Sequence, residues 1–493
     1  MASANAELWR LGGRRRLPLI VRLSAGGQGL PERGGENAFD CAIIESVRIS
    51  KSLHGVGGLR PETFRNTGGR NVNEAINWAH SGPDVFEKIP LEDIDVSNPE
   101  LFRDNVAEKL FSRLRKEDPV HFCKTSMFGP YWSVTKFKDI VQVETNPKVY
   151  SSDHSYGGIT IIDGESNSAV VLPMFIAMDP PKHDVQRKAV SPVVAPENLA
   201  KLEGLIRQRT ARALAELPVN ETFNWVELVS KNLTTQMLAT LFDFPWEDRA
   251  KLTYWSDVTT ALRGTGLVDT EEQRMAILGE CAAYMTRLWN ERVNAEPGND
   301  LISLLAHSDA TRNMAPEEFM GNVLLLIVGG NDTTRNTMSG SVLALNTHMA
   351  EYEKLCANPS LIPSMVSETI RWQTPLSHMR RTALEDTELG GKLIRKGDKV
   401  VMWYASGNRD EDEIENANSY LIDRAQPRHH LSFGFGIHRC VGNRLAELQL
   451  RIVWEEALKR WPKAGQIQVV GEPKRVLSPF VQGYESLPVR IAA

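Results

Sequence analysis

The chain has 493 residues, of which 42% are hydrophobic and 24% charged, and its formal net charge is -5 at pH 7. This is the balance of an ordinary globular protein. It excludes a strongly basic nucleic-acid-binding domain, because no region interleaves basic and aromatic residues. The five cysteines are scattered and include no CxxC pair, so neither a disulfide framework nor a zinc site is supported. We therefore expect a cytoplasmic protein without a nucleic-acid partner.

Residues 1–90 are expected to form a mobile or irregular extension, or to reflect the placement of the start codon, and residues 91–493 to form one domain. Most of the extension is rich in Gly, Arg and Asn and buries too little apolar surface to offset its ordering entropy. The segment RRRLPLIVRL has a short apolar core that Arg22 interrupts, so it is a poor signal or membrane span. No transmembrane anchor is predicted.

Helical periodicity dominates from residue 98 onward. Residues 98–118 carry apolar side chains at helical spacing, and residues 119–125 and 129–137 are predicted to be two short strands joined by a turn. Further helices are predicted over residues 196–217, 225–242, 271–295, 317–349 and 362–372, and strands return within residues 387–405 and 487–493. The pattern predicts a mainly α domain with small peripheral β-sheets.

The segment LSFGFGIHRCVG, residues 431–442, places Cys440 between glycines and just before a predicted helix. The free N–H groups of a helix N-terminus favour a thiolate, so we expect a lowered pKa for Cys440. The glycines permit close approach of a large flat ligand. A lone cysteine is more often a buried and inert residue. The pattern Phe433-x-x-Gly436-x-x-x-Cys440-x-Gly442 argues against that reading.

This pattern resembles the haem-binding loop of the cytochrome P450 superfamily, the haem-thiolate monooxygenases. In that family the cysteine is the proximal ligand of the iron. The resemblance implies the single-domain P450 fold, a triangular helical prism, with haem b as cofactor. It also implies that Cys440 holds the iron and that Phe433 and Gly442 lie at the cofactor.

The segment IVGGNDTTRN lies in the middle of the helix predicted over residues 317–349. Each glycine in a helix interior lowers helix stability by roughly 1 kcal/mol relative to alanine. Two adjacent glycines in this helix therefore require an explanation. Close helix packing would be the default explanation for an isolated stretch. Beside the cysteine loop, the segment resembles the acid–alcohol pair of the superfamily. The resemblance implies that Thr333 stabilises oxygen at the iron and that Asp332 relays protons.

Glu368 and Arg371 in SETIRW are spaced to pair on one helix face, as many surface salt bridges do. In register with the other motifs they resemble the Glu-x-x-Arg pair of the family, with Arg424 as the third member and a structural role.

The segment MDPPKHDVQRKAV places His183 and Arg187 one turn apart on a helix that follows two prolines. A surface pair is the simplest interpretation. The resemblance implies instead that they bind the haem propionates, together with Arg381 and His438, whereas the neighbouring Arg380 is not assigned.

Several stretches are similar to bacterial hydroxylases that oxidise the terminal methyl groups of medium-chain alkanes and fatty acids. The resemblance places an apolar substrate pocket at Leu325, Val328, Gly329, Leu376 and Phe480, with further candidates at Val170, Val171, Leu172 and Phe175. Apolar linings suit hydrocarbons, although core packing explains any one of these residues equally well. Terpenoid or other cyclic substrates are the alternative.

The chain has no GxGxxG dinucleotide fingerprint, and only about fifty residues follow Cys440. Electrons must therefore come from another protein. By resemblance, this is an iron–sulfur ferredoxin with its NAD(P)H-dependent ferredoxin reductase, docking near Arg439 and Arg444. The expected reaction inserts one atom of O2 into a C–H bond. The rival readings are a peroxygenase, which the acid–alcohol pair disfavours, and a non-catalytic haem sensor or carrier.

Overall fold

The computed structural model describes residues 82–163, 172–262 and 266–492. Residues 1–81, most of the predicted extension, lie outside the described residues, as do Val170 and Val171. The first described helix, α2 (Pro83–Lys88), buries Phe86 in a cluster that also contains Leu101 and Trp403. No helix of the described part of the chain is long and apolar enough to cross a membrane.

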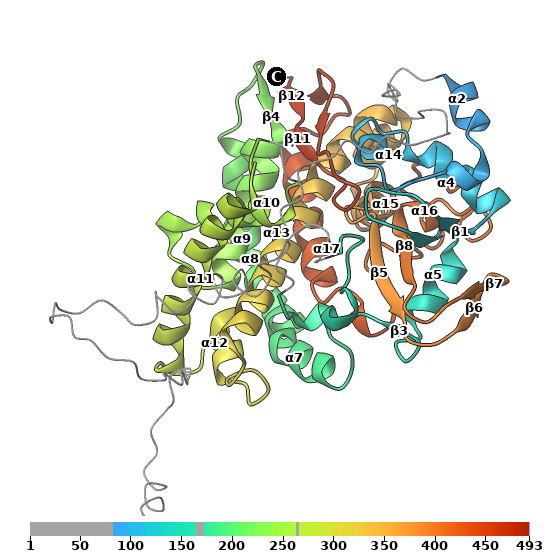
Figure 1. Cartoon of the computed structure of the whole chain (residues 1–493). Helices are drawn as coiled ribbons and strands as arrows, with labels where there is room; N and C mark the ends of the chain where they lie inside the picture. Colours follow the sequence, from blue (N-terminus) through green and yellow to red (C-terminus); the bar gives the residue numbers. More distant parts are fainter. Residues whose placement is uncertain (1–81, 164–171, 263–265, 493) are drawn as a thin grey trace, which may run out of the picture.

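The long helix α13 (Pro316–Thr347) passes through the middle of the molecule (Figure 1). It packs against α9 (Asn232–Leu241), α10 (Ala250–Thr260), α15 (Ile362–Gln373) and α17 (Asn443–Arg460). Most of its side chains are buried, which explains why its sequence is apolar on several faces. Figure 1 shows three further helices on one side of it, α8 (Pro196–Ala215), α11 (Glu271–Val293) and α12 (Leu301–His307).

The largest sheet lies on the other side of α13 (Figure 1) and has the strand order β1-β2-β8-β5-β3. Its strands are β1 (Val120–Cys123), β2 (Tyr131–Val134), β3 (Tyr150–Ser151), β5 (His378–Ala383) and β8 (Lys399–Trp403). The pairs β1–β2, β5–β8 and β3–β5 are antiparallel, whereas β2–β8 is parallel. Every residue of the central β8 is buried, as expected for the apolar run that follows Lys399, and Lys399 itself pairs with Asp163 at 2.6 Å.

Among the described residues, three smaller sheets lie at the periphery. They are formed by β4 (Thr222–Asn224), β12 (Pro488–Ile491) and β9 (Ile467–Val469), by β6 (Thr387–Leu389) and β7 (Lys392–Ile394), and by β10 (Lys474–Arg475) and β11 (Tyr484–Ser486). Further α-helices are α5 (Phe137–Glu144), α7 (Lys182–Val190), α14 (Met349–Ala357) and α16 (Tyr404–Gly407). The prediction of a mainly α fold with small β-sheets is confirmed.

Two predicted helices are interrupted. The apolar pattern over residues 98–118 forms two helices, α3 (Pro99–Arg103) and α4 (Ala107–Glu117), because Asn105 between them is left-handed with a φ of 57°. The helix predicted over residues 225–242 begins with a wider π-helical segment, Val226–Lys231, before α9. In contrast, α13 runs unbroken through the adjacent Gly329 and Gly330.

Candidate active site

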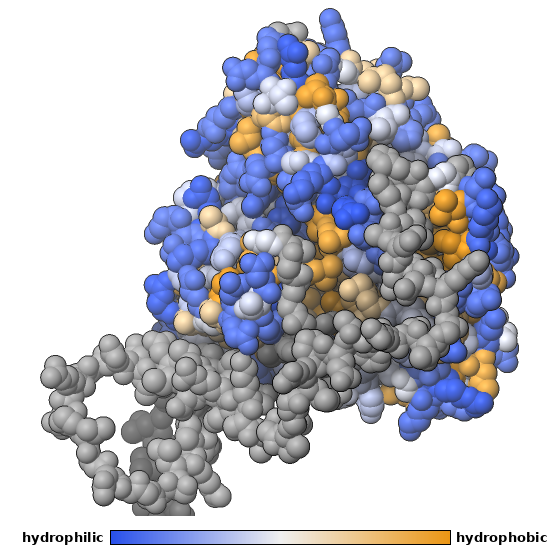
Figure 2. Space-filling model, turned by 45° about the horizontal axis from the view of Figure 1, so that its top comes forward, coloured by the Kyte–Doolittle hydropathy of each residue, from blue (hydrophilic) through white to orange (hydrophobic). Residues whose placement is uncertain are grey.

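A cavity of about 2630 Å³ lies between α13, the loop before α17, and β5, and its lining includes Cys440, Thr333 and Arg381. Figure 2 shows apolar side chains gathered in a hollow on one face of the molecule, bordered by polar surface. Typical small-molecule pockets occupy about 300–1,000 Å³. The cavity therefore has room for a large cofactor and a substrate together.

The loop that carries Cys440 is held in a fixed conformation by short-range contacts. The backbone N–H of Cys440 donates to the carbonyl oxygen of Phe433 at 2.7 Å. Helix α17 begins three residues after Cys440, at Asn443. Gly434 and Gly436 have φ angles of 66° and 62°, which glycine adopts without strain. A Cβ on Gly436 would also overlap the carbonyl oxygen of Glu144. The loop therefore requires glycine at position 436.

The thiol of Cys440 faces the cavity, and its pKa corrects one expectation. Burial within the protein raises the pKa of Cys440, whereas the N–H of Gly442 and the charges of Arg187 and Arg439 lower it. The N–H contribution that the helix N-terminus predicts is present, but burial outweighs it and the two arginine charges together. A thiol with a raised pKa can still bind a metal ion, because the metal displaces the thiol proton when it binds. Cys440 can therefore act as a metal ligand although its thiol is neutral without the metal.

Three of the four residues predicted to bind propionates, Arg187, Arg381 and His438, line the cavity, and the fourth, His183, is buried against His438. The rings of His183 in α7 and His438 are 4.3 Å apart, edge to face. Arg187 donates to the carbonyl oxygen of Arg439, and Arg381 in β5 donates to the carbonyl oxygen of Arg380 at 2.7 Å. Within the described residues, Nε2 of His183 and both ring nitrogens of His438 are buried without a hydrogen-bond partner.

Burial and the neighbouring positive charges of Arg381 and Arg187 lower the pKa of His438 to about 2. Burial also lowers the pKa of His183. Both rings are therefore neutral near pH 7. The single ring N–H of His183 is on Nδ1 and donates to the carboxylate of Asp184 at 2.7 Å, whereas His438 carries an N–H that can donate to an anion. Buried nitrogens without partners indicate a missing polar group, and arginine pairs strongly with carboxylates. The set fits the two propionates of a haem whose iron Cys440 would hold.

Sequence reasoning missed Glu144, the last residue of α5 and one of the most buried carboxyl groups near the loop. Its carboxyl group accepts from Arg381 at 3.4 Å, from the hydroxyl of Tyr404, and from the backbone N–H of Phe435. Burial raises its pKa. Because these partners lie 237 to 291 residues away, no local pattern could have revealed it.

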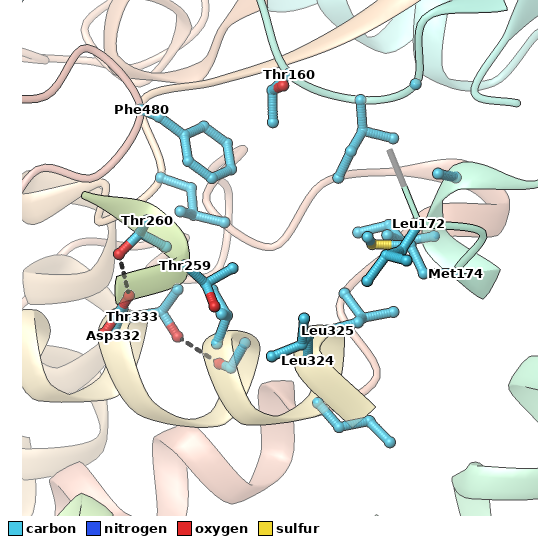
Figure 3. Close-up of a pocket in the computed structure, with 18 of the residues that line it drawn as sticks. Thr160, Leu172, Met174, Thr259, Thr260, Leu324, Leu325, Asp332, Thr333 and Phe480 are labelled. Atoms are coloured by element: carbon cyan, nitrogen blue, oxygen red, sulfur yellow. Dashed lines mark hydrogen bonds between the residues drawn. The ribbon is translucent and has the colours of Figure 1, made fainter. Parts of the chain in front are cut away.

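The acid–alcohol pair lies across the cavity, on α13. The Thr333 hydroxyl donates to the carbonyl oxygen of Gly329 at 2.9 Å (Figure 3). Thr333 and Gly329 both line the cavity, and a Cβ on Gly329 would have nothing within 4 Å. Gly329 thus leaves open space on the cavity side of α13.

Asp332 is buried and tied to its surroundings by four donors. Its carboxylate accepts from Arg335 at 2.8 Å and Asn331 at 3.0 Å on α13, and from two hydroxyl groups of α10, Ser256 at 3.3 Å and Thr260 at 3.2 Å. Burial raises the pKa of Asp332, opposed by the positive charge of Arg335. Thr260 also lines the cavity, so its hydroxyl connects the cavity to the carboxylate (Figure 3). Sequence reasoning did not identify it.

The predicted Glu-x-x-Arg group is assembled and almost completely inaccessible. Arg371 donates to Glu368 at 2.7 and 2.8 Å, and Arg424 donates to it at 2.8 Å. Arg371 also donates to three backbone carbonyls, and the side chains of Glu368 and Arg371 are 0% and 1% exposed. The simple surface-pair reading is therefore wrong for this pair.

All five residues predicted for the substrate pocket line the cavity, namely Leu325, Val328, Gly329, Leu376 and Phe480. Leu172 and Phe175 line it as well. Figure 3 shows Leu324 and Leu325 of α13 on one side of the open space and Phe480 and Thr160 across from them. The lining is mainly apolar in this region, as a hydrocarbon pocket requires.

Comparisons with known proteins agree with this geometry. The family model "Cytochrome P450" matches residues 269–463. Linalool 8-monooxygenase of Pseudomonas putida is 36% identical over 407 residues, covering 81% of this chain and 99% of that protein. A methyl-branched lipid omega-hydroxylase of Mycobacterium tuberculosis is 30% identical over 433 residues, covering 85% and 99%.

The solved structure of CYP153D17 from Sphingomonas sp. PAMC 26605 is also similar. It shares 51% sequence identity and a TM-score of 0.75, covering 81% of this chain and 99% of that one. The chain therefore belongs to the cytochrome P450 family, whose members bind haem b, and it is a monooxygenase of that family.

Proposed function

We propose that this P450 hydroxylates the terminal methyl group of medium-chain alkanes or fatty acids, using electrons from a ferredoxin and its NAD(P)H-dependent reductase. The observation that carries the proposal is the apolar cavity that runs from the Asp332–Thr333 pair to Leu172, Leu325 and Phe480. The similarity to a protein named methyl-branched lipid omega-hydroxylase supports a terminal position of attack.

The residues of the site have distinct roles in this proposal. Cys440 is the iron ligand, and Phe433 and Gly442 lie at the cofactor, while His183, Arg187, Arg381 and His438 hold the propionates. Glu368, Arg371 and Arg424 fix the region before the cysteine loop. When bound, haem supplies the iron at which dioxygen is activated.

Asp332 and Thr333 take part in proton delivery in this proposal. Since burial raises the pKa of Asp332, its carboxyl group holds a proton at higher pH than an ordinary aspartate does. The Thr260 hydroxyl lies in the cavity lining at 3.2 Å from that carboxyl, so a proton has a short path toward the substrate side. The Thr333 hydroxyl can turn from the Gly329 carbonyl toward the cavity.

The charged residues of the lining favour an uncharged chain. Arg380 pairs with Asp163, and Arg274 donates to the backbone carbonyls of Val258 and Ala261. A fatty-acid carboxylate would have to displace these partners, whereas an alkane would not. We therefore expect alkanes to be oxidised more efficiently than fatty acids of equal length.

Arg439 and Arg444 lie on either side of Cys440 in the sequence, are exposed, and are absent from the cavity lining. They would attract an acidic redox partner by charge complementarity. Charge reversal of both residues is expected to slow electron delivery from a ferredoxin at low ionic strength and to leave haem binding intact.

A substrate panel of alkanes, fatty acids and terpenes, with a surrogate ferredoxin system and mass spectrometry, tests the proposal. Predominant oxidation at terminal carbons of linear chains is expected. Exclusive attack on ring or internal carbons would refute it. A terpenoid substrate is the second candidate, because one similar protein is named for its action on linalool.

Two variants test the assigned residues. Cys440→Ser should abolish the red-shifted Soret band of the reduced, carbon monoxide-bound protein, and persistence of that band would exclude Cys440 as the ligand. Thr333→Ala should retain haem but divert electrons into hydrogen peroxide, and unchanged coupling would contradict its role.

A further inference from the structure

His378, the first residue of β5, is a buried histidine that the roles above do not use. Its side chain is fully buried in the protein and also borders the cavity. The ring packs between Trp403, with ring centroids 4.8 Å apart, and Phe480, at 5.3 Å. It thus lies directly behind a predicted substrate-contacting residue.

Both ring nitrogens of His378 have backbone partners. Nδ1 lies 2.9 Å from the carbonyl oxygen of Pro479, and because a carbonyl can only accept, Nδ1 carries the hydrogen. Nε2 then accepts from the backbone N–H of Ile161 at 3.4 Å. Burial lowers the pKa of His378 to about 4, so near neutral pH the ring keeps the neutral form that both bonds need.

The two partners belong to different walls of the cavity. Ile161 lies in the segment of residues 159–163, and Pro479 lies in the C-terminal turn that presents Phe480. Each wall also has its own bond to the chain around β5, since Arg380 donates to the carbonyl oxygen of Ile159 at 2.8 Å and Ser377 donates to that of Phe480 at 2.9 Å. The His378 ring bonds to both walls at once.

We propose that His378 is a specificity-determining positioning residue, whose ring fixes the spacing between the 159–161 segment and the Phe480 turn. This inference rests on the proposed function, in which these walls hold an apolar chain. Figure 3 shows Thr160 and Phe480 on the side of the pocket that faces Leu324 and Leu325. A change in the spacing between the 159–161 segment and the Phe480 turn alters how deeply the end of a substrate chain enters the pocket. It therefore alters which carbon is oxidised.

His378→Phe is the direct test, because it keeps an aromatic ring but removes both hydrogen bonds. In the haem-loaded enzyme, hydrogen exchange measured by mass spectrometry should accelerate several-fold in peptides covering residues 159–161 and 478–482. With n-octane, the ratio of subterminal to terminal alcohols should rise several-fold, while the Soret spectrum stays unchanged. His378→Gln, which retains an N–H and a carbonyl oxygen, should restore part of both properties.

Ser377→Ala is the matched control. Its hydroxyl donates to the same carbonyl of Pro479, but it makes no bond to Ile161. It should accelerate exchange in residues 478–482 alone. Unchanged exchange at residues 159–161 in His378→Phe would overturn the proposed link, and altered exchange with an unchanged product ratio would overturn the specificity role. Failure of the wild type to oxidise n-octane would count against the proposed function, whereas the exchange comparison tests His378 independently.

Discussion

Replacing Gly436 with alanine should damage the cysteine loop in two separable ways. The φ angle of 62° lies in the left-handed region, which costs a non-glycine residue about 1–2 kcal/mol. The added Cβ would also overlap the carbonyl oxygen of Glu144, and such overpacking costs about 1–3 kcal/mol. The sum is a loss of about 2–5 kcal/mol in the free energy of unfolding.

Gly465 provides the matched control, because its φ is 78° and an added Cβ would meet nothing within 4 Å. Gly465→Ala should therefore lose only the conformational part, about 1–2 kcal/mol. Denaturant unfolding of the haem-loaded variants measures both losses, and the ratio of Soret to protein absorbance measures retained haem. Equal destabilisation, or full haem retention in Gly436→Ala, would refute the steric argument.

Three further predictions concern buried carboxyl groups. Glu144→Gln should lower the free energy of unfolding by about 3–5 kcal/mol, because Arg381 loses its carboxylate, whereas Tyr404→Phe, which removes one donor, should cost about 1–3 kcal/mol. Glu368→Ala should cost about 3–5 kcal/mol in denaturant unfolding, because it leaves Arg371 buried without its charge partner. Since burial raises the folded-state pKa of Asp332 above 3.8, wild-type stability relative to Asp332→Asn should fall as pH rises from 3.8 through that raised pKa. Unfolding measured across this pH window tests the sign.

Each of these predictions has a distinct contrary result. Equal losses for Glu144→Gln and Tyr404→Phe would show that Glu144 contributes no more than one hydrogen bond. A loss below about 1 kcal/mol for Glu368→Ala would place that pair among ordinary surface ion pairs. If the free energy of unfolding of the wild type rises with pH relative to that of Asp332→Asn, the pKa of Asp332 is lowered by folding and not raised.

The local motifs were readable because their chemistry lies within a few neighbouring residues. Helical spacing identified the long helices, and α13 and α15 begin and end within a few residues of the predicted bounds. The break at Asn105 was missed because apolar spacing continues across it, while a single left-handed residue redirects the chain. Helix propensity and apolar periodicity are properties of a whole segment, so they do not predict the φ angle of a single residue such as Asn105.

By itself, the sequence determined that Cys440 lies in a glycine-rich loop before a helix and that Asp332 and Thr333 occupy a long apolar helix. Only the tertiary structure decided the surroundings that control these groups. Burial raises the pKa of Cys440, although the sequence predicts a lowered value. The hydrogen-bond partners of the Glu144 carboxyl group lie more than two hundred residues away along the chain, and the backbone partners of the His378 ring lie more than one hundred residues away. Desolvation and hydrogen bonding depend on what packs around a group in space, so they follow from the fold and not from local spacing.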